Sequence, residues 1–503
     1  MAGPYILSID QGTTSTRAVV FDAAGAALAT AQKPFPQIYP RDGWVEHDPE
    51  EIWRTTVEVC RAAIAAVGGA SDIAAIGITN QRETTLVWDK RTHKTVGNAI
   101  VWQDRRGAAR CEALREAGKS PLIQKKTGLL IDSYFSATKV EWILSQSAEV
   151  KAAAAAGHLA FGTIDSFLVW RLTGGRTHAT DATNASRTML YDIHRGVWDE
   201  ELLALFDVPR HVLPDVRDTA ALYGQTDPAL FGRAIPITAV VGDQQGALVG
   251  QACFEPGSIK STYGTGCFVL VNTGATPLTS RHRLLTTIAY RLNGATTYAL
   301  EGSIFNAGTV VQWLRDGVGM IETAAQSEDL AASLDDAGSA ARPGGVIFVP
   351  AFTGLGAPYW DPNARGAILG LTRDSGRAEI VRAALDSVCF QTCDLLSALQ
   401  QDGIAAPGAL RVDGGMVSNK WLVQRLADLT GLSVERPAYG ETTVLGAAFL
   451  AGLGAGLFAS PDAIKAAWKL DFSARPRLAP ETRAALLAGW RVAVGRVLTP
   501  PRA

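Results

Sequence analysis

Short apolar runs separated by small polar turns open the chain. Tyr5–Asp10 and Arg17–Asp22 flank the turn Gln11-Gly12-Thr13-Thr14-Ser15, and a third run covers Ala26–Gln32. Apolar runs of this length between turn residues predict β-strands joined as an antiparallel meander.

A helix and two further strands are expected after the meander. Asp48 is suited to cap the helix and Pro49 to its first position, because aspartate accepts from free backbone N–H groups and proline lacks one. Ile73–Thr79 and Thr85–Trp88 are the strand-like runs. This order predicts an α/β unit whose first strands are antiparallel.

A similar order returns in the second half, where Ser258–Thr262 and Cys267–Val271 flank a glycine-rich turn. Further strands and helices are expected at Thr286–Tyr290, Thr297–Leu300, Phe305–Asp316, Ala378–Leu399, Leu410–Asp413 and Ser418–Thr430. The repeat predicts two α/β domains, 1–252 and 253–503, that meet near the turn Glu255-Pro256-Gly257. A cleft between two domains is a usual place for a small ligand.

The composition narrows the class of protein. The chain of 503 residues is 47% hydrophobic and 19% charged, which is typical of a compact globular protein. Its 47 basic and 49 acidic residues leave a formal charge of −2, so no basic footprint for nucleic acid is present. We expect a cytoplasmic protein, because no secretory signal and no apolar run of ~18 residues is visible. The six scattered cysteines lack the spacing of a zinc site and fit a reducing compartment.

Asp10 and the turn that follows it are the first candidate for chemistry. A carboxylate at a strand end can hold a metal ion, and the N–H groups and hydroxyls of the turn can hold phosphates, with Arg17 as a nearby cation. Taken alone, an ordinary Asx-type hairpin turn is an equally good interpretation.

Asp243 is the second candidate, because the apolar run before Gly242-Asp243 also ends in an acid. A carboxylate there can accept the proton of an attacking hydroxyl, although for this motif alone a strand-to-helix cap is the better interpretation. The turns Tyr263-Gly264-Thr265-Gly266 and Asp413-Gly414-Gly415 would let a backbone approach a ligand closely, although for either alone an ordinary turn is the better interpretation. Two acids at two strand ends can meet across one cleft.

These four motifs, in this order, resemble those of the actin-like (ribonuclease H-like) ATPase domains. Longer stretches are similar to the FGGY family of carbohydrate kinases: SIDQGTTSTRAVVFD from Ser8, ITNQRETTLVWDK from Ile78, VPAFTGLGAPYWDPNARGAILGLTR from Val349 and RVDGGMVSN from Arg411. The likeness runs from residue 8 to about residue 450. It implies an α/β fold of two actin-like ATPase domains with a central cleft.

The resemblance also implies the activity, which is transfer of the γ-phosphoryl of ATP, with Mg²⁺, to a terminal hydroxyl of glycerol. Asp243 matches the catalytic base and Asp10 the position that organises Mg²⁺. The implied glycerol-binding residues are Arg82, Glu83, Tyr134, Asp243 and Gln244, with Trp102 and Phe268 as aromatic walls. The implied nucleotide-binding residues are Thr13, Thr14, Ser15, Arg17, Thr265, Gly308, Gln312, Gly415 and Asn419.

Three alternatives stay open at this point. The first is another sugar or polyol kinase of the family, such as a xylulokinase or gluconokinase. The residues that argue against it are the Arg82-Glu83 pair, Tyr134 and Trp102. The second is an ATP-driven switch without a small substrate. The third is an inactive binding protein, which would tolerate the loss of Asp10 or Asp243. Members of the family often form dimers or tetramers, so a homo-oligomer is expected by analogy.

The loop before Gly242 predicts how the activity is regulated. Some members of the family are inhibited by fructose 1,6-bisphosphate through a glycine-rich loop that carries an arginine just before Ile-Pro. Here Ala234 takes the place of that arginine, and Asp227 lies close to the displaced Arg233. Because a bisphosphate needs several cations or free N–H groups, we expect no inhibition by this route.

Overall fold

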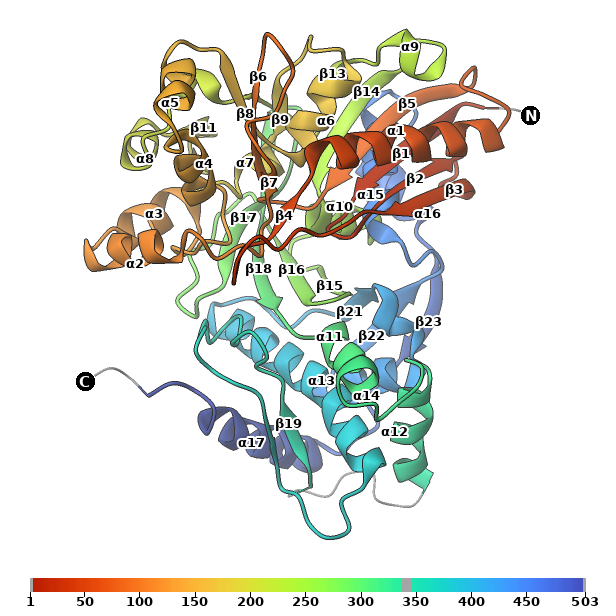
Figure 1. Cartoon of the computed structure of the whole chain (residues 1–503). Coiled ribbons are helices and arrows are strands. Elements are labelled where there is room, and N and C mark those ends of the chain that lie inside the picture. The colour runs from red at the N-terminus through yellow and green to blue at the C-terminus, as the bar shows by residue number, and fades with distance from the viewer. Residues whose placement is uncertain (1–2, 337–344, 501–503) are drawn as a thin grey trace.

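The computed structural model describes residues 3–336 and 345–500. Two halves lie one above the other, each built on its own β-sheet with helices packed against it (Figure 1). The expected two-domain α/β fold of the actin-like type is confirmed.

The sheet of the first half has six strands, and the predicted meander of β1, β2 and β3 forms one side of it. β1 pairs antiparallel with β2 and parallel with β5, and β5 pairs parallel with β14. The strand order across the sheet is β13 (Ala220–Gln225), β14 (Pro236–Gly242), β5 (Ile73–Asn80), β1 (Tyr5–Gln11), β2 (Ser15–Phe21) and β3 (Ala27–Pro34).

The sheet of the second half repeats this plan. β15 pairs antiparallel with β16 and parallel with β21, so β18-β16-β15-β21-β22 matches β3-β2-β1-β5-β14 in order and direction. The full order is β17 (Leu285–Leu292), β18 (Ala295–Ile304), β16 (Cys267–Gly274), β15 (Ile259–Tyr263), β21 (Ala409–Asp413), β22 (Ser433–Pro437) and β23 (Leu470–Ala474). The duplication predicted from the sequence is therefore present strand by strand.

Helix α1 (Pro49–Ala66) forms for the predicted reason. The Asp48 carboxylate accepts from the Glu50 N–H at 2.9 Å, and Pro49 occupies the first turn. Ile52 and Val59 lie on the face that packs against β2 and β3, so burial of this face adds to the cap.

Smaller elements surround the two sheets. The first half adds the sheet β4 (Glu46–His47), β7 (Ala99–Ile100), β6 (Thr85–Asp89) and β8 (Leu159–Thr163), the short strands β9 (Ala179–Asp181), β10 (Tyr191–Asp192), β11 (Val197–Trp198) and β12 (Asp215–Arg217), and the helices α2 (Ala108–Glu116), α3 (Ser120–Thr127), α4 (Ala137–Leu144), α5 (Ala148–Ala155), α6 (Ile164–Leu172), α7 (Ala182–Ala185), α8 (Glu200–Leu205), α9 (Pro228–Phe231) and α10 (Asp243–Gly250). The second half adds α11 (Gly308–Gln312), α12 (Gln326–Asp336), β19 (Ile347–Val349), β20 (Ala367–Leu369), α13 (Arg377–Gln401), α14 (Lys420–Thr430), α15 (Thr442–Gly454), α16 (Pro461–Ala467) and α17 (Pro480–Gly495).

The helix expected at Phe305–Asp316 differs in detail. It begins at Gly308 and continues after Gln312 as a π-helical turn over Trp313–Gly317. The Gly308 N–H donates to the Gly264 carbonyl at 2.9 Å, so the first turn is tied to the glycine-rich hairpin rather than to the residues before it.

Helix α15 lies in sequence between β22 and β23 of the second sheet but packs on β1, β5 and β14 of the first, beside α10 (Figure 1). The backbones touch there, because a Cβ added at Gly77, Gly250 or Gly446 would lie within 3.0 Å of a backbone oxygen. Glycine at these positions lets the two halves share one packed junction.

Candidate active site

Asp10 and Asp243 lie at one edge of the first sheet. Asp10 is near the end of β1 opposite Thr79 of β5, and Asp243 follows Gly242, which lies opposite Asn80 of the same strand. Burial raises the pKa of Asp10 to about 7; Arg17 opposes this rise and the Asp243 carboxylate adds to it. The two acids found separately in the sequence therefore interact through space.

Arg82 follows β5 and connects Asp243 to the second half. Its Nε lies 2.9 Å from Asp243 Oδ1, and its Nη1 donates to Glu301 Oε2 at 2.5 Å. The Arg82 side chain is 2% exposed. A buried guanidinium between two carboxylates has a fixed position, and this position depends on both domains.

Glu301 on β18 is the centre of this ionic network, and the sequence analysis missed it. Besides Arg82, it accepts from Arg187 Nη2 at 2.8 Å. Burial works to raise the pKa of Glu301, but Arg187 and Arg82 outweigh it and hold the pKa at about 2. Glu301 is therefore a permanent anion shared by two arginines.

Glu83 is held by the same network. Its Oε1 accepts from Arg187 Nε at 2.6 Å, and its carbonyl accepts from Ser136 Oγ at 3.0 Å. Its φ of 60° lies in the left-handed region, which costs ~1–3 kcal/mol for a residue other than glycine. Strain of this kind persists where the surrounding contacts over-determine the backbone, as they do at Glu83.

Three aromatic rings stand beside the charged network. The Trp102 ring lies edge-on to Tyr134 at 5.6 Å and to Phe268 at 6.4 Å, measured between ring centroids. Trp102 Nε1 also donates to Thr13 Oγ1 at 3.0 Å. This bond joins the expected aromatic wall to the expected phosphate-binding turn.

Gln244 has a partner that the sequence analysis also missed. Lys260 of β15 is buried, and its Nζ donates to Gln244 Oε1 at 2.5 Å. Burial lowers the pKa of Lys260 to about 8, while Asp413, Glu301 and Asp243 act in the opposite direction. Lys260 thus supplies positive charge beside the residues that follow β14.

The turn after Asp10 has the expected hairpin geometry. The Gly12 N–H donates to the Ser15 carbonyl at 3.0 Å, and Ser15 Oγ accepts from Gln32 at 2.8 Å. Thr14 is exposed. Arg17 forms an ion pair with Glu441, which precedes α15, so this cation already contacts the second half.

The residues expected at the nucleotide lie on three separate elements of the second half. Thr265 is in the β15–β16 turn, and its carbonyl accepts from the Thr309 N–H at 3.2 Å next to Gly308. A Cβ at Gly308 would lie 2.6 Å from the Gly264 oxygen, so only glycine fits this approach. Gln312 ends α11.

Gly415 and Asn419 stand apart from these contacts, after β21. Asn419 has a structural role, since its Oδ1 accepts from the Leu422 N–H at 2.8 Å and caps α14. Gly415 begins the 3₁₀ turn before it, and a Cβ there would point into open space.

The duplicated sheets, with acids at one strand edge and an ionic network reaching between the halves, define a two-domain protein of the actin-like ATPase fold. The N-terminal domain of the FGGY family of carbohydrate kinases matches residues 5–250, and its C-terminal domain matches residues 259–455. The chain belongs to this family, which removes the switch without a small substrate from the alternatives.

Individual relatives cover nearly the whole chain. A glycerol kinase of Rhodospirillum centenum is 63% identical over 494 residues, covering 98% of both chains. Glycerol kinase 1 of Pseudomonas aeruginosa is 58% identical over 494 residues, covering 98% of this chain and 99% of that one. The crystal structure of Plasmodium falciparum glycerol kinase with ADP shares 37% identity over 98% of both chains, with a TM-score of 0.90.

Proposed function

We propose that this chain phosphorylates glycerol, transferring the γ-phosphoryl group of ATP to a terminal hydroxyl to give sn-glycerol 3-phosphate. The observation that carries the proposal is the buried network of Arg82, Glu83, Glu301 and Arg187, which ends at Asp243. The curated relatives at 55–63% identity, all named glycerol kinases, support the same substrate.

Substrate selection follows from the polar groups that the network leaves available. The hydrogen bonds that described residues make to the Glu83 and Asp243 carboxylates fall on Glu83 Oε1 and Asp243 Oδ1. Glu83 Oε2 and Asp243 Oδ2 are thus left to accept from substrate hydroxyls. A site built to bond hydroxyls rejects analogues that lack them, because its own buried groups would stay unpaired. Trp102 and Phe268 would enclose the carbon backbone of the polyol.

Asp243 would act as the general base. Burial is the main influence on its pKa and raises it, whereas Arg82 opposes the rise. A carboxylate whose pKa is raised is a better proton acceptor than a free aspartate. Asp243 Oδ2 takes the proton of the terminal hydroxyl, the hydroxyl oxygen attacks the γ-phosphorus, and ADP leaves with the bridging oxygen.

The residues around Asp10 fit a Mg²⁺ ion. Within residues 3–336 and 345–500, no group of three or more His, Cys, Asp or Glu side chains could hold a metal. Mg²⁺ in kinases needs only one or two carboxylates, with phosphates and waters as the other ligands. Burial raises the pKa of Asp10 to about 7, so a cation nearby would restore its charge. When bound, Mg²⁺ neutralises phosphate charge.

The remaining site residues would hold the nucleotide. Thr13, Thr14, Ser15 and Arg17 would contact the β- and γ-phosphates from the first half. Thr265, Gly308 and Gln312 would contact the nucleotide from the second half, with Gly415 and Asn419 at its adenosine end. Phosphoryl transfer requires mainly positioning and charge neutralisation, which these groups supply from both sides.

An ADP-release assay over glycerol, xylulose, gluconate and erythritol tests the function. Glycerol should give the highest kcat/KM, and Asp243→Asn should lower kcat by ~10²–10⁴-fold. Asp462→Asn, an exposed acid on α16, is the matched control and should leave kcat unchanged. Equal turnover of xylulose, or near-normal turnover by Asp243→Asn, would refute the substrate or the base respectively.

We also propose a cytoplasmic homo-oligomer. Among the described residues all six cysteines are free thiols, which suits a reducing compartment. None of the helices in residues 3–336 and 345–500 is long and apolar enough to cross a membrane. Light scattering on the purified chain would measure the number of subunits.

A further inference from the structure

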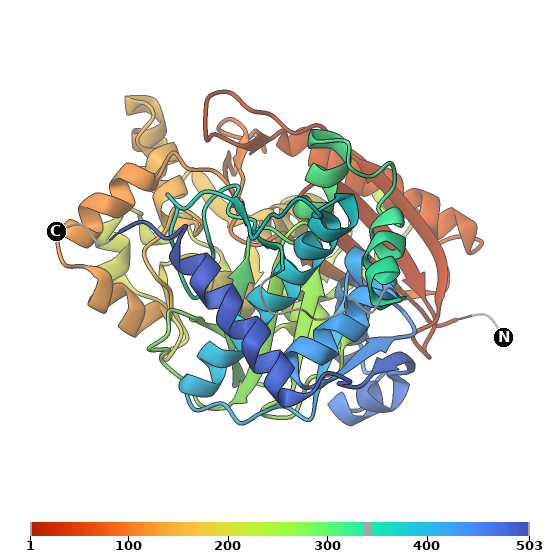
Figure 2. The ribbon, with the colours of Figure 1, turned by 90° about the horizontal axis from the view of Figure 1, so that it is seen from below.

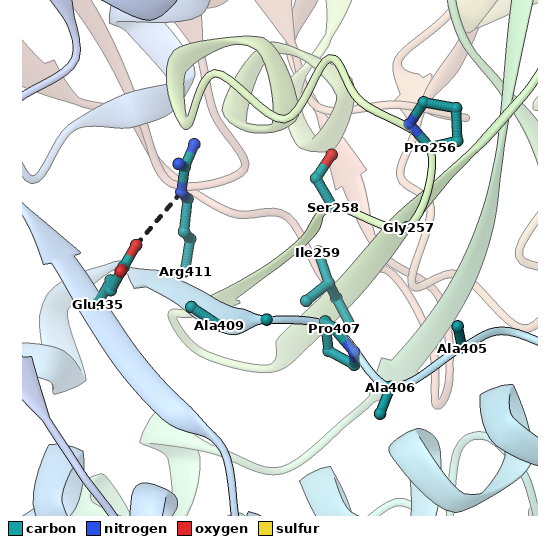
Figure 3. A pocket seen from close by; sticks show the side chains of 11 residues that line it. Pro256, Gly257, Ser258, Ile259, Ala405, Ala406, Pro407, Ala409, Arg411 and Glu435 are labelled. Atoms are coloured by element: carbon teal, nitrogen blue, oxygen red, sulfur yellow. Dashed lines mark ion pairs between the residues drawn. The ribbon is translucent and has the colours of Figure 1, made fainter.

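Cavities outside the proposed active site differ in whether their charges are already paired. A cavity of about 410 Å³ beside β15, β21 and β22 has alanine and proline walls, and its Arg411 faces Glu435 at 3.6 Å (Figure 3). A cavity of about 520 Å³ beside α4 and α5 contains the pair Arg110–Glu141 at 2.9 Å. Both of these arginines are already paired with a glutamate.

A third cavity, of about 400 Å³, is different. It lies between α13, the loop before β17 and α17, the dark blue helix that crosses the near face in Figure 2. Its wall contains Arg281 and Arg283 from the loop and Arg491 from α17. Three arginines from two separate elements therefore line one cavity.

Two of these arginines form no direct polar side-chain contact with a described residue, although Arg491 lies near enough to the Asp394 carboxylate to oppose the rise that burial causes in its pKa. Among the described residues, the side chains of Arg281 and Arg491 make no hydrogen bond and no ion pair. Arg283 Nη1 donates to the Tyr359 carbonyl at 2.6 Å, which is a neutral group. Burial lowers the pKa of Arg283 and the nearby Arg115 lowers it further, while Asp361 acts in the opposite direction.

The loop that carries Arg281 and Arg283 is held in place. The side chain of Asp402, just after α13, is 2% exposed and accepts from the Arg281 N–H at 2.8 Å and from His282 Nδ1 at 2.7 Å. Trp360 Nε1 donates to the Arg283 carbonyl at 2.7 Å, and Arg283 has a left-handed φ of 62°. The arginines are thus presented from a fixed turn, which reduces the entropy lost when an anion binds.

One carboxylate completes the wall. Asp394 Oδ2 accepts from Tyr359 at 2.9 Å and from Trp490 Nε1 at 2.7 Å. Both bonds fall on Oδ2, so Asp394 Oδ1 has no partner among the described residues. An acceptor beside three cations suits a ligand that carries a hydroxyl as well as a negative charge.

We propose that the cavity lined by Arg281, Arg283 and Arg491 binds a small phosphorylated metabolite that also carries a hydroxyl group. The guanidinium groups bond the phosphate oxygens, and Asp394 Oδ1 accepts from the hydroxyl. A hollow of about 400 Å³ has room for a phosphate monoester of a few carbon atoms. A nucleic acid is a poorer occupant, because the whole chain has a formal charge of −2.

Isothermal titration calorimetry on the full chain, without ATP or glycerol, tests this site independently of the proposed function. The probes are D-glucose 6-phosphate, inorganic phosphate and neutral glucose. We expect saturable binding of glucose 6-phosphate that weakens with added salt, weaker binding of phosphate, and no binding of glucose. Equal affinity for phosphate and glucose 6-phosphate would refute the role of Asp394.

Variants locate the binding. Arg281→Ala and Arg491→Ala should each weaken glucose 6-phosphate binding by at least ~10-fold, the loss of one charge-assisted hydrogen bond. Arg496→Ala, an exposed arginine just after the last turn of α17, is the matched control and should bind normally. Unchanged affinity in both pocket variants would overturn the proposal. So would tighter binding of a poly-glutamate peptide, which would assign the cavity to an acidic protein partner.

Discussion

Replacing Glu301 with glutamine removes one charge from the centre of the active-site network while keeping its shape. The substitution leaves Arg82 with Asp243 and leaves Arg187 with Glu83, but the anion that the two arginines share is lost. Two buried guanidinium groups then face a neutral amide that can accept from them only weakly.

The size of the effect follows from the pKa of Glu301. The fall from 4.5 to about 2 corresponds to about 3 kcal/mol of preference for the charged form in the folded protein. Removing one partner of a buried ion pair costs ~3–5 kcal/mol in other proteins, which is the same magnitude. Because the folded pKa is depressed, this stabilisation is fully present above pH 4.5 and is lost as the pH falls toward 2.

Urea unfolding at pH 7 should therefore show a loss of about 3 kcal/mol for Glu301→Gln, and the difference from the wild type should shrink as the pH falls from 4.5 toward 2. Glu435→Gln is the matched control, since this acid of the same sheet pairs with Arg411 at 3.6 Å while 27% exposed. An exposed pair contributes ~0–1 kcal/mol. If the two variants lost the same stability, the central position assigned to Glu301 would be wrong.

Three further substitutions or additions probe the site and its regulation. Arg82→Ala should raise the KM for glycerol by the equivalent of ~1.5–3 kcal/mol and spare the KM for ATP in initial-rate assays; the reverse pattern would contradict its placement. Trp102→Phe removes the 3.0 Å hydrogen bond to Thr13 but keeps an aromatic side chain, so the KM for glycerol should rise only a few-fold with kcat retained. Fructose 1,6-bisphosphate should not inhibit at low ionic strength, because Arg233 donates to the Ser71 carbonyl at 2.5 Å; saturable inhibition that Arg233→Ala abolishes would refute this.

The central strands of both sheets could be predicted because apolar runs and glycine turns mark them locally. Tyr5–Asp10 and Leu410–Asp413 differ from the observed strands by one residue at one end. The position of α15 could not be predicted in this way. Its packing on β1 and β5 depends on contacts hundreds of positions away in the chain, which no local pattern records.

The acids at the strand ends could be found from the sequence because turn motifs surround them. Sequence reasoning could not find Glu301, Arg187 and Lys260 in this way, because they lie in or beside regular elements without a motif. One signal was available: Glu301 and Lys260 are single charges in runs that are otherwise apolar or small. A charge in a buried strand requires a partner, so such positions predict an ion pair even when the partner is unknown.

The junction of α10 and α15 limits how this protein can evolve. At Gly77, Gly250 and Gly446 a backbone oxygen occupies the place that a Cβ would take. Only glycine therefore fits at these three positions, whereas the neighbouring Leu248 can exchange with other apolar residues of similar volume. Because α10 begins at Asp243, a change at the junction would shift the residue proposed as the base. Lineages that keep the reaction should therefore keep all three glycines, even where the surface around them has changed completely.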